Sequence, residues 1–174
     1  NNQHFKFLNK LVGRKENGME LAALDEITAA CQKMSETKTG ALIVIAHSSS
    51  LEDVIESGDV IDARISRSLR ENLFFKNSPL HDGAMIINGT KIVSAGCFLP
   101  LSQNVDNIPK DLGSRHRAGI GVTETIDVIS LIVSEETGII SIVKQGNVTR
   151  YADYDMLAKA LKDYYWQEMP LMDR

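Results

Sequence analysis

The sequence predicts a single α/β domain with a mixed central β-sheet flanked by helices on both faces. Three observations predict this fold class. The chain has 174 residues, a length typical of one domain. Apolar runs rich in β-branched residues alternate with segments of helical periodicity, which is typical of helices packed on a sheet. Asn88-Gly89 separates two of the strand-like runs and predicts a hairpin, so antiparallel pairs must occur within the series.

Local patterns predict the elements of the first half of the chain in order. Apolar residues at i, i+3, i+4 spacing predict a helix from Met19 to about Lys38. The continuous apolar run Gly40–Ala46 predicts a strand buried on both faces. Ser50, with Asp53 three residues later, is the expected N-cap of a short helix. We further expect this helix to end near Ser57, a strand at Val60–Ile65, a helix at Ser66–Phe75, and a hairpin of strands Gly83–Ile87 and Lys91–Leu99.

The second half of the chain begins with an expected loop at Pro100–Pro109. Gly113 or Ser114 is expected to start a helix that runs to about Thr123. An amphipathic pattern at 153–166 predicts a closing helix. The strands expected between these helices are Asp127–Val133, Ile139–Lys144 and Val148–Arg150, with turns at Glu135–Gly138 and Gln145–Asn147.

Five side chains outside the aliphatic runs are expected in the core. Cys31 and Cys97 lack CxxC partners, so we expect neither a disulfide framework nor a zinc site. Two buried thiols in a reducing compartment fit the sequence better. Tyr164, Tyr165 and Trp166 end the amphipathic helix, where aromatic side chains more often pack in the core than form a stacking platform.

Composition limits the classes of function. The net charge of −4 argues against a nucleic-acid partner, which usually selects a basic surface. The longest apolar run, Ala41–Ala46, is six residues, whereas a membrane-spanning helix needs about 20. The chain does not begin with Met, and we interpret it as a piece of a longer protein. We divide it into an entry helix and linker at 1–18, the domain at 19–168 and a tail at 169–174.

The first motif is Asn77-Ser-Pro-Leu-His-Asp-Gly-Ala84, immediately before a predicted strand. The carboxylate of Asp82 at a strand edge can bind a divalent cation or deprotonate a hydroxyl. Gly83 would let a ligand approach the backbone closely. The alternative interpretation is an Asx turn in which Asp82 caps its own backbone. The residues of this segment alone leave both interpretations open.

The second motif is Leu112-Gly-Ser-Arg-His-Arg-Ala118, at a predicted helix start. The free N–H groups and the dipole of a helix N-terminus favour an anion. Arg115 and Arg117 add permanent positive charge, His116 adds a donor, and Ser114 can cap the helix and offer a hydroxyl. A solvated basic turn is the alternative interpretation. The phosphate site is favoured because this basic cluster occurs in an acidic chain.

The third motif is Val133-Ser-Glu-Glu-Thr-Gly138, which follows a predicted strand. Alone it is most simply a plain hairpin turn. The functional interpretation places Ser134 and Glu136 beside phosphates, with Glu136 helping to hold a metal.

Together these motifs resemble the diadenylate cyclase (DAC) domain family. The resemblance is carried, in this order, by His81-Asp-Gly-Ala84, Phe98-Leu-Pro-Leu-Ser102, Gly113-Ser-Arg-His-Arg-Ala118 and Ser134-Glu-Glu-Thr-Gly138, and it covers roughly residues 20–165. The run Ala118–Glu124 looks most like the membrane-anchored CdaA type. The resemblance implies a mixed sheet flanked by helices, and the condensation of two ATP into cyclic di-3′,5′-AMP with release of two pyrophosphates.

The resemblance also implies roles for individual residues. Asp82 would bind the metal and favour loss of the 3′-hydroxyl proton, while Leu99 would pack on adenine. Phe98 stands where relatives often carry Tyr, and Ser114 replaces the more usual Thr. The residues implied for catalysis are Asp82, Arg115 and His116; those for ATP binding are Gly83, Ala84, Phe98, Leu99, Gly113, Ser114, Arg115, His116, Arg117, Ser134 and Glu136; those for metal are Asp82, His81 and Glu136.

Cofactor and partners follow from the same resemblance. We expect a divalent metal, Mn²⁺ or Mg²⁺, with Co²⁺ as a further candidate. Because one set of motifs holds one ATP, a homodimer or higher homo-oligomer is expected to form the complete site. The parent protein is expected to be anchored in a bacterial cell membrane by a segment before Asn1, with a cytoplasmic catalytic domain and a regulatory protein partner. A binding module that senses adenine nucleotides without chemistry is the alternative.

Overall fold

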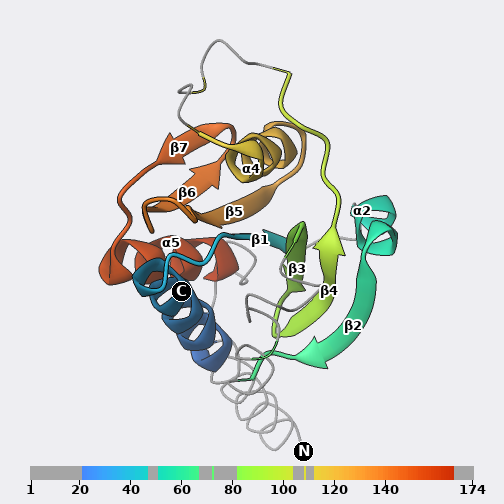
Figure 1. Cartoon of the computed structure of the whole chain (residues 1–174). Coiled ribbons are helices and arrows are strands. Elements are labelled where there is room, and N and C mark those ends of the chain that lie inside the picture. Colours follow the sequence, from blue (N-terminus) through green and yellow to red (C-terminus); the bar gives the residue numbers. More distant parts are fainter. Residues whose placement is uncertain are drawn as a thin grey trace, which may run out of the picture.

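A seven-stranded mixed sheet forms the centre of the computed structural model, which describes residues 21–46, 51–66, 72, 82–103, 108 and 112–166 (Figure 1). The strand order is β2-β4-β3-β1-β5-β6-β7. Strands β1 and β3 are parallel, and the other five neighbouring pairs are antiparallel. The strands are β1 (Ala41–Ala46), β2 (Asp59–Arg64), β3 (Ala84–Asn88), β4 (Lys91–Cys97), β5 (Val128–Val133), β6 (Ile140–Lys144) and β7 (Asn147–Thr149).

Helices cover both faces of this sheet (Figure 1). They are a helix over 21–36, α2 (Glu52–Ser57), α4 (Ser114–Thr125) and α5 (Tyr154–Trp166). Successive side chains of β1 point to opposite faces, as a strand requires. Ile43 and Ile45 join the core beneath the helix at 21–36 and α5, whereas Leu42 and Val44 join the core beneath α2 and α4. The predicted sheet with helices on both faces is therefore confirmed.

Two predicted local features differ in the structure, and a third is largely untested. The N-cap of α2 is Leu51 rather than Ser50, and no side chain caps that helix; the Leu51 side chain is buried. Asn88 pairs with Lys91, so the hairpin loop is Gly89-Thr90, one residue later than predicted. The shift follows from the pairing of Asn88 with Lys91, which makes Asn88 the last residue of β3. Gly89 then takes a positive φ (59°), which glycine adopts without steric cost. The helix predicted at Ser66–Phe75 lies mostly outside the described residues.

The aromatic residues expected in the core are buried where the structure describes them. Tyr164 donates its hydroxyl to the carbonyl of Asp127 (3.0 Å), and Tyr165 donates to that of Gly89 (2.7 Å). The side chain of Trp166 lies outside the described part. These bonds satisfy the polar tips of two otherwise apolar side chains and connect α5 to two distant loops.

Both cysteines are free and buried, as expected. Burial raises the pKa of the Cys31 thiol to about 12. The pKa of Cys97 is also raised, chiefly by burial. Among the described helices, none combines the length and the apolar character that crossing a bilayer requires.

Gly83 is required where the chain enters β3. Its φ is +83°, and an added Cβ would lie 2.7 Å from the carbonyl oxygen of Cys97. Gly89 also has a positive φ, +59°, but an added Cβ there meets nothing within 4 Å. The two glycines therefore share a left-handed backbone and differ in the space around it.

We expect Gly83→Ala to destabilise the domain clearly more than Gly89→Ala. The left-handed backbone alone costs about 1–2 kcal/mol for an alanine. The clash with β4 adds roughly 1–3 kcal/mol at Gly83 only. Chemical denaturation of both variants measures the difference, and equal losses of unfolding free energy would contradict the close approach of Gly83 to β4.

Candidate functional site

The pairing register brings five strand ends to one end of the sheet. Ala41 at the start of β1 pairs with Val133 at the end of β5, and Val133 pairs with Ile140 at the start of β6. Ala84, which starts β3, pairs with Cys97 at the end of β4. Because β3 runs parallel to β1, its start lies at the same end as Ala41.

Three segments of the sequence motifs lie next to the sheet at this end. Asp82-Gly83 precedes β3, Phe98-Leu99 follows β4, and the turn Ser134–Gly138 follows β5. Neighbouring strands lie about 4.8 Å apart, so β1 separates the β3 and β5 ends by a total of about 10 Å. The motifs are thus adjacent in space although they are far apart in the chain.

The N-terminus of α4 lies at the same end. Its N-cap is Gly113, not Ser114, and no side chain caps the first turn. The helix packs closely on the sheet at Gly119, where an added Cβ would lie 2.9 Å from Ile132 Cδ1. Ser130 on β5 donates its hydroxyl to the Gly119 carbonyl (2.9 Å). This contact fixes where the uncapped N–H groups of α4 point.

Arg115 on the first turn of α4 reaches the start of β1. An added Cβ on Gly40 would overlap Arg115 Nη1 and would lie 3.0 Å from Glu135 Cβ. Arg115 Nη1 lies 3.5 Å from Glu135 Oε2, and Arg115 is only 20% exposed against 67% for Glu135. Gly40 therefore provides the space in which the Arg115 guanidinium lies between α4 and the turn after β5.

A cavity of about 500 Å³ lies between the start of α4 and this turn. It brings together six of the residues predicted for the site, together with a further arginine that follows β7. The lining residues are Leu112, Gly113, Ser114, Arg115, His116, Val133, Ser134, Glu135, Glu136, Thr137, Ile139 and Arg150.

The turn Ser134–Gly138 is both a structured turn and a wall of the cavity. The Ser134 hydroxyl accepts the N–H groups of Glu136 and Thr137, each at 3.3 Å. Gly138 takes a φ of +75°, and its carbonyl accepts the hydroxyl of Ser35 at 2.5 Å. The simple hairpin-turn interpretation therefore describes the backbone correctly, while the same turn presents polar groups to the cavity.

The other predicted residues lie elsewhere. Asp82 and Phe98 are exposed, Leu99 and Gly83 are partly buried, and Ala84 is buried in the core. All five lie on the β3–β4 side of the same sheet end and do not line the cavity.

Arg117 also does not line the cavity. Residues two apart on a helix do not share a face, so Arg115 and Arg117 project differently. The backbone of Arg117 instead accepts the N–H of Ser102 (3.1 Å). The predicted role of Arg117 in the phosphate turn stays a prediction, and His81 lies outside the described residues.

Sequence patterns missed three contributors to this site: Gly40, Glu135 and Arg150. Gly40 immediately precedes β1 and does not end a helix, so no local pattern marks it as a site residue. Its role depends on the packing of Arg115 over it. Glu135 is adjacent to the predicted Glu136, but only the ion pair with Arg115 distinguishes the two carboxylates. Arg150 follows a short edge strand and carries no motif.

The carboxylates fit a divalent cation only in part. Within the described ranges, no group of three or more His, Cys, Asp or Glu side chains could hold a metal. Asp82 and Glu136 are both exposed, at opposite sides of β1. Such single carboxylates suit Mg²⁺ or Mn²⁺, which commonly take one or two protein ligands and complete their shell with substrate phosphates and water.

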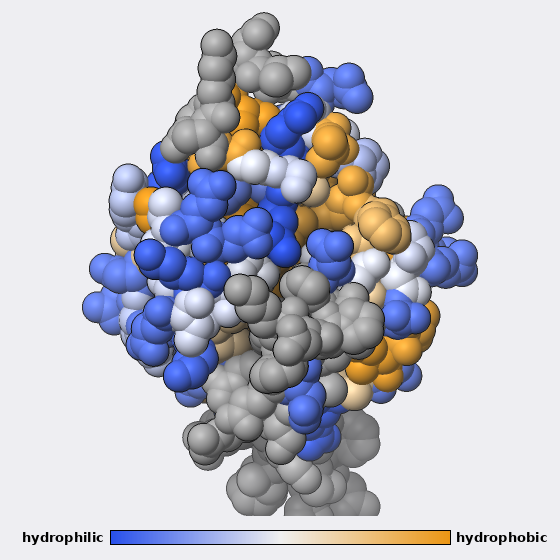
Figure 2. All heavy atoms as spheres, in the orientation of Figure 1, coloured by the Kyte–Doolittle hydropathy of each residue, from blue (hydrophilic) through white to orange (hydrophobic). Residues whose placement is uncertain are grey.

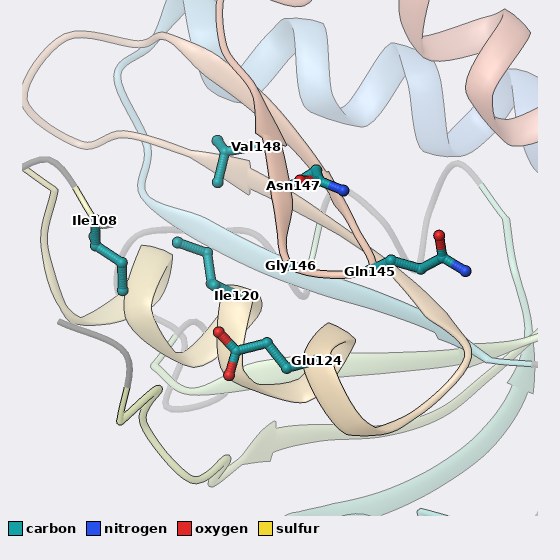
Figure 3. Close-up of a pocket in the computed structure, with 7 residues that line it drawn as sticks. All are labelled: Ile108, Ile120, Glu124, Gln145, Gly146, Asn147 and Val148. Carbon is teal, nitrogen blue, oxygen red and sulfur yellow. The ribbon is translucent and has the colours of Figure 1, made fainter. Parts of the chain in front are cut away.

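A second cavity, of about 440 Å³, lies between α4 and the β6–β7 turn (Figure 3). Glu124, near the end of α4, is the only ionisable residue among those that line it. Glu124 accepts the hydroxyl of Ser102 (2.9 Å). Ile120 and Glu124 belong to the run Ala118–Glu124, but none of the predicted site residues contributes to the wall. A lining with a carboxylate and no cation is unsuited to phosphate.

An uncapped helix N-terminus, arginines and hydroxyls around one cavity of an α/β domain are features that favour phosphate groups. Comparison with known families identifies it further. Residues 28–148 match the family described as DisA bacterial checkpoint controller nucleotide-binding, DAC. The chain belongs to this DAC family, and the resemblance seen in the sequence motifs is confirmed.

Individual relatives agree with this assignment. The chain is 44% identical over 138 residues to the diadenylate cyclase of Listeria monocytogenes, a match that covers 79% of this chain and 50% of the relative. It is 41% identical over 140 residues to the cyclic di-AMP synthase CdaA of Bacillus subtilis, covering 80% of this chain and 50% of the relative. The chain spans about half the length of these curated relatives.

Solved structures show the same fold. A double mutant of DacA from Staphylococcus aureus superimposes with a TM-score of 0.79 at 41% identity, covering 83% of this chain and 96% of that chain. A hypothetical membrane spanning protein from Bacillus cereus gives a TM-score of 0.69 at 40% identity, and the match covers 74% of this chain and 63% of that chain.

The contact between Gly40 and Arg115 predicts the effect of a single methyl group. We expect Gly40→Ala to displace the guanidinium and to weaken binding of ATP about tenfold, as the loss of one charge-assisted hydrogen bond would. In an Arg115→Ala background, the same substitution should change affinity much less, because its target is gone. Calorimetric titration of the wild type, both single variants and the double variant measures this coupling. Additive losses would contradict it.

Proposed function

We propose that this domain condenses two ATP into cyclic di-3′,5′-AMP and two pyrophosphates. The observation that carries the proposal is the convergence of the family's motifs at one end of the sheet. The names of relatives such as the Listeria diadenylate cyclase support the same activity. A fold of this kind could bind nucleotides for other purposes, so the proposal depends on the site rather than on the sheet.

We place the triphosphate in the cavity at the start of α4. The N–H groups of an uncapped first turn and the Arg115 guanidinium favour an anion there. The adenosine would then lie toward β3 and β4, where Leu99 and the exposed Phe98 offer apolar surface. Gly83 and Ala84 would contribute backbone to the ribose side, since the Ala84 side chain points into the core.

The reaction needs orientation and charge neutralisation more than covalent chemistry. The 3′-oxygen of one ATP forms a bond to the α-phosphorus of the other, and the bond from that phosphorus to the β-phosphate oxygen breaks. The 3′-hydroxyl proton leaves toward Asp82 or water, and pyrophosphate departs with the bonding electron pair. A second identical step closes the ring.

A divalent cation, when bound, would neutralise part of the negative charge on the phosphates and so ease the approach of the 3′-oxygen. Asp82 and Glu136, with His81 as a further donor, are the residues proposed to hold it, and Mn²⁺, Mg²⁺ and Co²⁺ all suit such oxygen-rich sites. Arg115 and His116 would orient the triphosphate. His116 is 7% exposed, so it contributes from a largely buried position at the cavity wall.

One copy of the chain holds one set of these motifs, whereas the product contains two adenosines. We therefore propose that two protomers face each other across a two-fold axis. Phe98 is 75% exposed and Leu101 42% exposed on the segment that leaves β4. Figure 2 shows apolar surface over this region, between α2 and α4. Such surface suits a contact between copies beside the site.

Incubation with ATP and Mn²⁺, followed by chromatography, tests the activity. We expect cyclic dinucleotide and pyrophosphate to appear, and Asp82→Asn to reduce turnover by at least about a hundredfold, in the range of losing a catalytic base. Asp155→Asn, an exposed change on α5, is the matched control and should retain full turnover. Bound but unchanged ATP at high protein concentration would instead favour the nucleotide-sensing module.

A dilution series tests the composite site. If two protomers are needed, turnover per chain falls as the protein is diluted below its dimer dissociation constant, while ATP still binds each chain. Turnover per chain that stays constant under conditions where sedimentation shows only monomers would contradict the two-protomer proposal.

We propose that this domain belongs to a longer parent protein, since it spans about half the length of its curated relatives. The Bacillus cereus neighbour is described as a hypothetical membrane spanning protein, and one relative is the synthase CdaA. We propose that the parent protein is held at the membrane by a segment outside this sequence, and that a partner protein controls pairing of the cytoplasmic domains. Expression of the parent protein followed by membrane fractionation tests the anchor.

A further inference from the structure

Arg150 enters the candidate site from the far edge of the sheet. It directly follows β7, and it lines the same cavity as Ser114, Arg115 and Ser134. Thr149 pairs with Ile142, which places Arg150 near the start of β6 and therefore at the end of the sheet where the motifs converge. No motif of the sequence includes it.

The backbone around Arg150 is held on both sides. Before it, Thr149 belongs to the β6–β7 ladder. After it, Ala152 is buried and donates its N–H to the Ile140 carbonyl (2.9 Å). Between these points the chain turns at Tyr151, which has a φ of +60°. A left-handed conformation is costly for a tyrosine and persists only where the surroundings enforce it.

Tyr151 also contacts the arginine directly. The guanidinium carbon of Arg150 lies 5.5 Å from the centroid of the Tyr151 ring, a distance at which cation and ring attract. The ring is 70% exposed, so the contact contributes little to the core. It does restrict the directions in which the Arg150 side chain can point.

Arg150 contributes one of the two arginine charges in the lining of the cavity. Apart from His116, the ionisable residues that line it are Arg115, Arg150, Glu135 and Glu136, so two positive charges oppose two negative ones. Without Arg150 the lining side chains would carry an excess of one negative charge, which would weaken the attraction that the start of α4 exerts on a triphosphate. Arg115 pairs with Glu135 at 3.5 Å, and Arg150 adds a second guanidinium to the same lining.

The strand order gives the direction in which a nucleotide would extend. Adenosine is proposed at β4 and β3, and the first phosphate beside α4, above β1 and β5. The cavity continues from there toward β6 and β7, where Arg150 lies. The phosphates farthest from the ribose would therefore approach Arg150.

We propose that Arg150 binds the β- and γ-phosphates of the nucleotide and so makes the site selective for triphosphates. This inference rests on the proposed function for the place of the adenosine. The same guanidinium would face the departing pyrophosphate, whose added negative charge it can stabilise by bidentate hydrogen bonds. Arg150 is thus a binding residue for the leaving part of the substrate.

Nucleotide titrations test the inference independently of turnover. Affinities for ATP, ADP and AMP are measured by calorimetry for the wild type, Arg150→Gln and Arg150→Lys. Arg64→Gln is the matched control, because Arg64 is exposed on the edge strand β2 and does not line the cavity. Thermal unfolding of each variant verifies that it is folded.

We expect Arg150→Gln to weaken ATP binding by about tenfold to a hundredfold, in the range of losing hydrogen bonds to a charged group. AMP binding should change by less than about twofold, since AMP lacks the phosphates concerned. Arg150→Lys should recover part of the loss, and Arg64→Gln should bind all three nucleotides as the wild type does.

Two outcomes would overturn the inference: unchanged ATP affinity in Arg150→Gln, or equal losses for ATP and AMP. Failure of the proposed function looks different. In that case the wild type makes no cyclic dinucleotide, yet the preference for ATP over AMP would still depend on Arg150. Conversely, the wild type could cyclise ATP while the Arg150→Gln variant binds ATP with normal affinity. That result would support the proposed function and exclude the role of Arg150 in binding the β- and γ-phosphates.

Discussion

The pairing of β1 with β3 on one side and β5 on the other is the constraint on which the rest of the structure depends. All six residues of β1 are buried, so its backbone groups must be satisfied by the two neighbouring strands. A shift of one residue would exchange the two faces of an apolar strand that packs against different helices. The register is therefore closely determined, and it places the start of β3 and the end of β5 together.

The same constraint gives the site its order. A parallel neighbour brings the start of a strand to the start of β1, whereas an antiparallel neighbour brings the end of a strand there. A motif before β3 and a motif after β5 thus meet at one end. Gly40, which immediately precedes β1, leaves between them the space that Arg115 occupies. The helix that carries Arg115 is held in place by the close packing of Gly119 on the sheet.

The electrostatics of the site are local rather than a property of the whole chain. The chain carries a net charge of −4, yet two arginines and an uncapped helix start face one cavity. Exposed carboxylates elsewhere are screened by water and salt, while charges in a partly enclosed cavity are screened less. An acidic domain can therefore still present a local site for a small polyanion.

The sequence by itself determined the class of fold and, through its motifs, the family. Periodicity separates helices from strands because side-chain directions repeat every 3.6 or 2 residues, and it located β1, β5, α4 and α5 closely. It could not place the two-residue loop at Gly89-Thr90, since pairing with β4 decides where β3 ends. Tertiary structure alone decided that Arg115 lies in the cavity wall while Arg117 does not, and that Arg150 joins it from β7. These are contacts between residues that are distant in the chain. They follow from strand register and helix orientation, and local sequence patterns predict neither.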